Sequence, residues 1–142
     1  MNPNALQTKA QQRGWNVVTE RDAHGPILTL VRDDWELWVA FSGKVPESAT
    51  LRKPGRPEPG RLVLREIGMW VRRDRTQMSR FAIGDRVTVA GRIGTVTDIL
   101  LDKSRISGKS GRVRLQVAYD GGGVSIPYSE QVHRPHAQAG QR

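Results

Sequence analysis

Short runs of alternating apolar and polar residues dominate the second half of the chain. In the longest run, Val113, Leu115 and Val117 alternate with Arg114 and Gln116. Alternation with period two is typical of a strand with one buried face. The alternation and the glycines between the runs predict four strands: Arg86–Ala90, Gly94–Leu101, Arg112–Asp120 and Val124–Pro127. A sandwich needs more chain than this, and closure into a small barrel would remove the open sheet edges.

The alternation also predicts which side chains fill this barrel. We expect its core to contain Val87, Val89, Val96, Ile99, Leu115, Val117 and Ile126.

The first half of the chain opens with helix signals. Asn2 and Pro3 suit a helix N-cap and first position, the following residues to Arg13 are compatible with a helix, and Gly14 suits its C-terminal end. Three strands should follow, at Trp15–Glu20, Ile27–Arg32 and Trp35–Phe41. Four prolines predict a mostly irregular chain over residues 42–60.

Residues 61–73 carry apolar side chains at helical spacing, so we favour a second helix there. Leu62 and Leu64 also permit a strand, and Gly68 weakens the helix. The predicted fold class is α+β: an N-terminal three-stranded antiparallel sheet with one or two helices, followed by a small SH3-like β-barrel. The predicted boundaries are a small α+β domain at 1–75, a linker at 76–80, the barrel at 81–134 and a disordered tail at 135–142.

The barrel segment resembles a known family. The run Gly84-Asp85-Arg86-Val87, followed by Gly91 and by Gly94-Thr95-Val96, is similar to the first two strands of KOW-type SH3-like barrels. Residues 124–128 followed by 129–132 resemble the last strand and short helical turn of such barrels. The resemblance implies a binding module without fixing its ligand, because these barrels bind RNA, DNA, peptides and protein surfaces.

The N-terminal order of elements resembles the αβββα plan of double-stranded-RNA-binding domains and HicA-type toxins. Gly14-Trp15 is followed ten residues after the glycine by His24, a spacing that is similar to HicA-type proteins. Asp22-Ala23 stands where that family usually has Gly-Ser. The resemblance implies a ribonuclease with His24 as its catalytic histidine. The alternative, which we favour, is that His24 only occupies the turn before Gly25 and Pro26.

The composition narrows the classes of function. The 142 residues contain no cysteine, so disulfides and thiolate metal sites are excluded, and we expect a cytoplasmic protein. The three histidines are not spaced for metal, and no cofactor motif is present. No apolar run approaches the roughly 20 residues needed to cross a bilayer, and the N-terminus lacks a signal-peptide pattern. We therefore expect no membrane partner, no cofactor and no enzymatic activity.

The formal net charge is +9, which favours a polyanionic partner. Residues 51–81 concentrate it, with nine basic and three acidic side chains. The predicted binding residues of this segment are Arg52, Lys53, Arg56, Arg61, Arg65, Arg72, Arg73 and Arg75. A second basic cluster consists of Lys103, Arg105, Lys109, Arg112 and Arg114.

Trp38 is the candidate exposed aromatic. Trp35, Leu37 and Val39 share one face of a strand, so Trp38 lies on the other face. There it could stack on a base or anchor a protein contact, or a second layer could cover it.

Two functions use the same residues. The first is binding to the phosphate backbone of DNA or RNA with low sequence specificity. The alternative is a protein-interaction adaptor, such as a phage or mobile-element accessory protein, that docks its basic face on an acidic protein.

Overall fold

The computed structural model describes residues 1–102 and 111–135. The chain divides into two compact units, an N-terminal unit (Met1–Thr76) and a C-terminal unit (Gln77–Arg142). Each unit has its own antiparallel sheet, and the two helices belong to the N-terminal unit. The predicted α+β fold class is therefore confirmed.

The N-terminal unit begins with helix α1 (Pro3–Gln12). The Asn2 side chain accepts a hydrogen bond of 2.7 Å from the backbone N–H of Ala5, and Pro3 occupies the first turn, where no backbone donor is lost. Gly14 has a φ of +84°, the left-handed conformation that ends many helices. The predicted first helix and both of its ends are confirmed.

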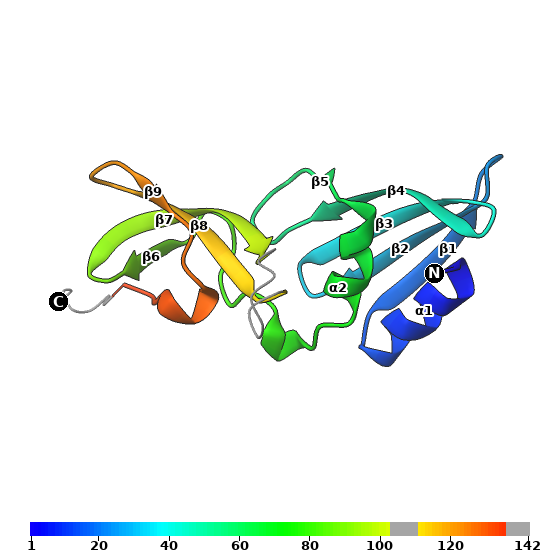
Figure 1. Ribbon diagram of the computed structural model, residues 1–142, viewed down its shortest axis with the longest axis horizontal. Coiled ribbons are helices and arrows are strands. Elements are labelled where there is room, and N and C mark those ends of the chain that lie inside the picture. Colours follow the sequence, from blue (N-terminus) through cyan, green and yellow to red (C-terminus); the bar gives the residue numbers. More distant parts are fainter. Residues whose placement is uncertain (103–110, 136–142) are drawn as a thin grey trace. The chain divides into compact units, whose positions relative to one another are not determined.

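Five strands follow in chain order, and each is antiparallel to the next (Figure 1). Their bounds are β1 (Asn16–Arg21), β2 (Pro26–Arg32), β3 (Trp35–Ser42), β4 (Val45–Arg52) and β5 (Gly60–Arg61). The three predicted strands are present within one residue at each end. The expectation of a three-stranded sheet is wrong because β4 and β5 extend it.

Strand β4 lies where the prolines predicted an irregular chain. Its only proline, Pro46, pairs with Phe41 beside an irregularity in the register between Ala40 and Phe41. A proline is tolerated where the ladder is already interrupted. Beyond it, Ala49 and Leu51 alternate as buried residues, and the other prolines follow after the strand ends.

The second predicted helix is shorter than expected. Residues 61–73 contain the end of β5, a 3₁₀ turn η1 (Leu64–Glu66) and helix α2 (Ile67–Val71). Another 3₁₀ turn, η2 (Arg75–Gln77), follows. Both structures allowed by the pattern are thus present, the strand before Leu62 and the helix after Glu66.

The core of this unit lies between one face of the sheet and the helices. Trp35 is 3% exposed, and its ring packs on Trp70 of α2 with centroids 4.9 Å apart. Leu6 of α1 and Ile67 of α2 are also buried. The side chains that alternate inward from the sheet are Leu28, Leu30, Leu37, Val39, Phe41, Ala49 and Leu51.

The C-terminal unit has a four-stranded sheet in the order β6-β7-β8-β9 (Figure 1). The strands are β6 (Arg86–Val89), β7 (Arg92–Leu101), β8 (Val113–Tyr119) and β9 (Val124–Ser125). A 3₁₀ turn η3 (Ser129–Gln131) follows at the predicted position.

The predicted closed barrel is wrong, because the sheet is not closed by a continuous ladder. Strand β9 has only two residues, and after η3 the chain meets β6 through one isolated bridge between Thr88 and His133. The bridge is held by two backbone hydrogen bonds of 2.8 and 3.0 Å.

The predicted core of this unit is correct for five residues, Val87, Val96, Ile99, Leu115 and Val117. Val89 is half-buried and Ile126 is 39% exposed, so these two were wrongly placed. Ile126 lies just beyond the two-residue strand β9, where the alternation of the ladder no longer sets its direction. Two residues outside the strands, Phe81 and Val132, are buried and were not predicted as part of the core.

Gly94, part of the motif that resembles KOW-type barrels, allows β7 and β8 to pack closely. A Cβ at this position would lie 2.6 Å from the carbonyl oxygen of Ala118 and 2.7 Å from a methyl of Val117. Any side chain would therefore push β7 and β8 apart.

Among the described residues, no helix has the length and apolar character needed to span a membrane.

Candidate nucleic-acid interface

The face of the N-terminal sheet opposite the helices is only partly covered. The strand register aligns one residue from each strand in a row across it, because partners in an antiparallel ladder point to the same face. The row consists of Val18, Thr29, Trp38, Thr50 and Arg61. Trp38 is half-buried at its centre, whereas Val18 at one end is 56% exposed. This side of the sheet is called the open face.

A groove of about 510 Å³ lies on the open face, and Trp38 and Thr50 form part of it. Its other lining residues are Pro57, Pro59, Glu36 and Arg52. The two prolines belong to the connection between β4 and β5, so the segment predicted to be irregular supplies one wall. The volume is within the range of about 300–1,000 Å³ that is usual for ligand sites.

The two tryptophans of β3 are on opposite faces, as their odd spacing predicted. Trp35 is buried and Trp38 is half-exposed in the groove. The helices cover only the other face, so they leave Trp38 accessible within this unit.

Arg52 is a predicted binding residue that lines the groove together with Trp38, but its charge is compensated. Its Nε and Nη2 both donate to one carboxylate oxygen of Glu36, at 3.2 and 3.0 Å. Lys53 and Arg56 follow in the β4–β5 connection, are half-buried, and have interactions of their own.

Arg61, Arg65 and Arg72 are exposed, at β5, η1 and the end of α2 respectively. Within the described part of the chain, their guanidinium groups have no hydrogen-bond or ion-pair partner. An unpaired exposed arginine keeps all five N–H donors for an external anion.

Arg73 and Arg75 follow the end of α2 and are less available. Burial lowers the pKa of Arg73 because the charged form is partly desolvated. Arg75 donates to Asp33 at 3.0 Å, and nearby Arg13 donates to Asp74 at 2.7 Å. The basic segment therefore does not form one uniform binding surface.

Arg32 is a buried cation that the sequence analysis did not identify. It is 2% exposed, it donates to the backbone oxygen of Arg13 at 2.7 Å, and it stacks on Trp15 at 4.4 Å. Its Nε and Nη2 have no partner among the described atoms. Desolvation by burial lowers its pKa. The signal was present in the sequence, since Leu28, Leu30 and Arg32 alternate inward.

In the C-terminal unit, Arg112 and Arg114 both pack on the ring of Tyr128, at 4.3 and 4.7 Å. Arg112 forms an ion pair with Glu130, and Nε of Arg114 donates to the carbonyl oxygen of Ile126 at 2.8 Å. The two terminal nitrogens of Arg114 have no partner in the described ranges. Lys103, Arg105 and Lys109 lie outside the described residues.

Tyr128 is itself held in place. Its hydroxyl donates to the buried carboxylate of Asp102, and this hydrogen bond raises the pKa of Tyr128. The ring is therefore a fixed support for the two arginines.

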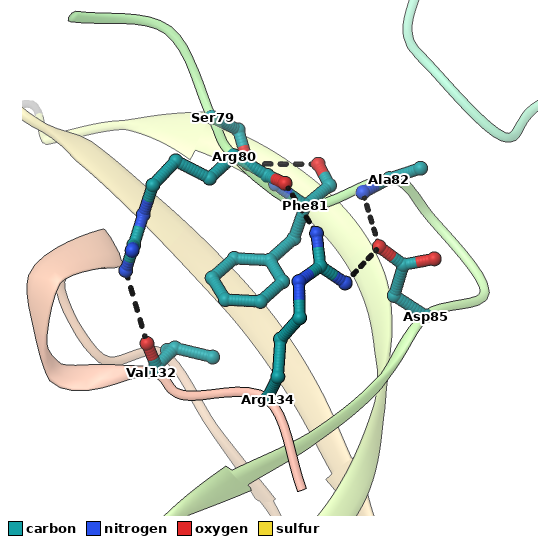
Figure 2. A network of polar contacts seen from close by, with 7 residues as sticks. All are labelled: Ser79, Arg80, Phe81, Ala82, Asp85, Val132 and Arg134. Atoms are coloured by element: carbon teal, nitrogen blue, oxygen red, sulfur yellow. Dashed lines mark hydrogen bonds and ion pairs between the residues drawn. The ribbon is translucent and has the colours of Figure 1, made fainter. Parts of the chain in front are cut away.

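A second arginine–aromatic cluster surrounds Phe81 (Figure 2). Arg80 and Arg134 pack on its ring at 5.2 and 4.8 Å. Arg134 also donates to the backbone of Arg80 at 3.1 Å and contacts Asp85 at 3.6 Å. Asp85, part of the motif that resembles KOW-type barrels, accepts a hydrogen bond of 2.9 Å from the backbone N–H of Ala82. This bond stabilises the turn before β6.

His24 lies exposed in the turn between β1 and β2. The Asp22 side chain accepts from the backbone N–H groups of His24 and Gly25, at 2.8 and 3.1 Å, and these bonds lower the pKa of Asp22. The geometry is that of an Asx-type turn. In the described parts of the chain, no three potential metal ligands lie together.

No family model, no curated protein and no solved structure matches this chain.

Proposed function

We propose that this protein is a non-enzymatic binding protein that contacts the phosphate backbone of nucleic acid with low sequence specificity. The observation that carries the proposal is the set of exposed, unpaired arginines Arg61, Arg65 and Arg72 within the most basic segment of the chain. Phosphates attract such groups and release counterions on binding, independently of base sequence.

In the C-terminal unit, Arg114 supplies a further phosphate contact, since its terminal nitrogens have no partner in the described ranges, whereas the neighbouring Arg112 is engaged by Glu130. A guanidinium that is stacked on a ring loses little side-chain freedom when it binds an anion. The support for this contact is the packing of Arg114 on the ring of Tyr128.

The KOW-type resemblance agrees with this proposal. The strand order of the C-terminal unit, the 3₁₀ turn η3 and the return of the chain to β6 support an incompletely closed relative of SH3-like barrels. Small barrels of this kind more often bind than catalyse. In the N-terminal unit, the hydrogen bonds from the backbone N–H groups of His24 and Gly25 to Asp22 support a turn role for His24.

The test is fluorescence anisotropy of the full chain with labelled duplex DNA, duplex RNA and single strands of two unrelated sequences, at several salt concentrations. We expect binding that weakens steeply with salt and differs little between sequences. Changing Arg61, Arg65 and Arg72 to Gln should weaken binding and lower the slope of log K against log salt by up to about three.

A matched control removes the same charge elsewhere in the N-terminal unit. Lys9, Arg21 and Lys44 are exposed and lie outside the basic segment. Their change to Gln should alter the salt slope much less. Equal effects of the two triple variants, or no binding by the parent at low salt, would contradict the proposal and favour an acidic protein as the partner.

A further inference from the structure

The open face of the N-terminal sheet carries features that phosphate binding alone does not use. Trp38 has a half-exposed ring at the centre of a five-strand row, and it lies in a groove whose other wall is Pro57 and Pro59. A tryptophan ring and two rigid prolines that line one groove offer a flat, apolar surface. We propose that this groove holds an unpaired base of a single-stranded nucleic acid stacked on Trp38; the inference rests on the proposed function.

The charges around the groove match such an occupant. Trp38, Thr50 and Arg61 lie on three successive strands, so two strand spacings, about 10 Å, separate the backbone of Trp38 from that of Arg61. Arg61 is unpaired and exposed, and it therefore suits the phosphate of the nucleotide whose base reaches Trp38. Glu36 lies at the groove with its charge balanced by Arg52, so a neutral base is accepted there more readily than a phosphate.

The geometry selects single strands over duplexes. In a duplex, both faces of every internal base are covered by the neighbouring bases, so a side chain that lines a protein groove cannot stack on an internal base. In a single strand the bases can be splayed out, and stacking on an aromatic side chain tolerates every base because each has a π-face. The expected preference is therefore for strand state and not for sequence.

The experiment measures affinity and tryptophan fluorescence of the full chain with oligothymidylate, oligouridylate and a hairpin duplex of equal charge. Trp15, Trp35 and Trp70 are buried, so quenching on binding should come mainly from Trp38. We expect both single strands to quench the fluorescence and the hairpin to quench it little. In Trp38→Phe the quenching should disappear while part of the affinity remains.

Trp38→Ala should weaken single-strand binding by at least about fivefold and leave hairpin binding unchanged, since one lost stack costs about 1–3 kcal/mol. Its salt slope should equal that of the parent, because no charge is removed. Val18→Ala, in the same row but outside the groove, is the matched control and should change neither affinity. Circular dichroism checks that each variant is folded.

Two kinds of failure are distinguishable. A parent protein that binds no oligonucleotide at low salt refutes the proposed function and the stacking site together. A parent that binds with the expected salt dependence, while Trp38→Ala weakens the hairpin and the single strands equally or neither of them, refutes the stacking site alone. The latter result would leave the open face to a protein partner.

Discussion

Trp35 and Trp38 lie three residues apart on β3, yet the two faces of the sheet give them different surroundings. Trp35 packs on Trp70 of α2 and is almost inaccessible, whereas Trp38 is half-buried and lines a groove with Thr50 and the prolines of the β4–β5 connection. The helices cover one face only. The buried Trp35 therefore contributes mainly to the stability of the fold, whereas Trp38 is available for binding.

The comparison is tested most strongly by changing each tryptophan to alanine. Trp35→Ala should lower the free energy of unfolding of the N-terminal unit by about 3–5 kcal/mol, because a large buried ring is replaced by a cavity. Trp38→Ala should lower it less, by about 1–2 kcal/mol, since part of that ring is already hydrated in the folded state. Chemical denaturation of the full chain measures both values.

If Trp35→Ala does not fold, Trp35→Phe keeps part of the packing and should still cost more than Trp38→Ala. Similar losses at the two positions would show that the open face is as well packed as the core face, and the distinction between them would be wrong.

Much of this comparison could be predicted from the sequence. The odd separation of Trp35 and Trp38 put them on opposite faces, and the alternation of Leu37, Val39 and Phe41 identified which face is buried. Local signals were equally reliable at the start of α1, where the Asn2 side chain caps the helix. These features depend on residues close together in the chain.

Features that depend on distant residues were missed. Strand β4 can contain Pro46 because its pairing with β3 is irregular at that point. No local sequence pattern indicates this irregularity. The availability of each arginine also depends on partners far away in sequence, such as Asp33 for Arg75. Composition therefore identified the basic segment, but it could not separate Arg61 from Arg52 or Arg75.

A second test concerns a buried charge on the core face, that of Arg32. Arg32 is buried with two donor nitrogens unpaired, so its desolvation is only partly compensated. Arg32→Met fills a similar volume without a charge. We expect the free energy of unfolding to stay the same or to rise by up to about 2 kcal/mol, measured by chemical denaturation.

The pH dependence of this effect has a definite sign. The pKa of Arg32 is lower in the folded state, so the folded protein binds this proton less tightly than the unfolded chain does. The cost of burying the charge is therefore present at every pH below the folded pKa and is relieved only in strongly alkaline solution.

Arg32→Gln, which keeps a polar group in the core, should be less stable than Arg32→Met. A loss of more than about 2 kcal/mol in Arg32→Met would show that the cation stabilises the core.

The smallest expected effect concerns the acidic group of the open face. Glu36 binds Arg52 at the groove, so it neutralises a potential phosphate contact. Glu36→Gln should tighten single-strand binding by about two- to fivefold at low salt, because exposed charges a few ångströms apart interact by about 1 kcal/mol in water. The gain should vanish at high salt, where such interactions are screened. Glu47→Gln removes the same charge from β4 at an exposed position where the register with β3 is interrupted and which does not line the groove, so it should give a smaller gain. Anisotropy titrations of both variants at two salt concentrations measure the difference. Weaker binding by Glu36→Gln would mean that the carboxylate positions Arg52 for its ligand, and equal gains in the two variants would mean that only the net charge matters and the groove does not.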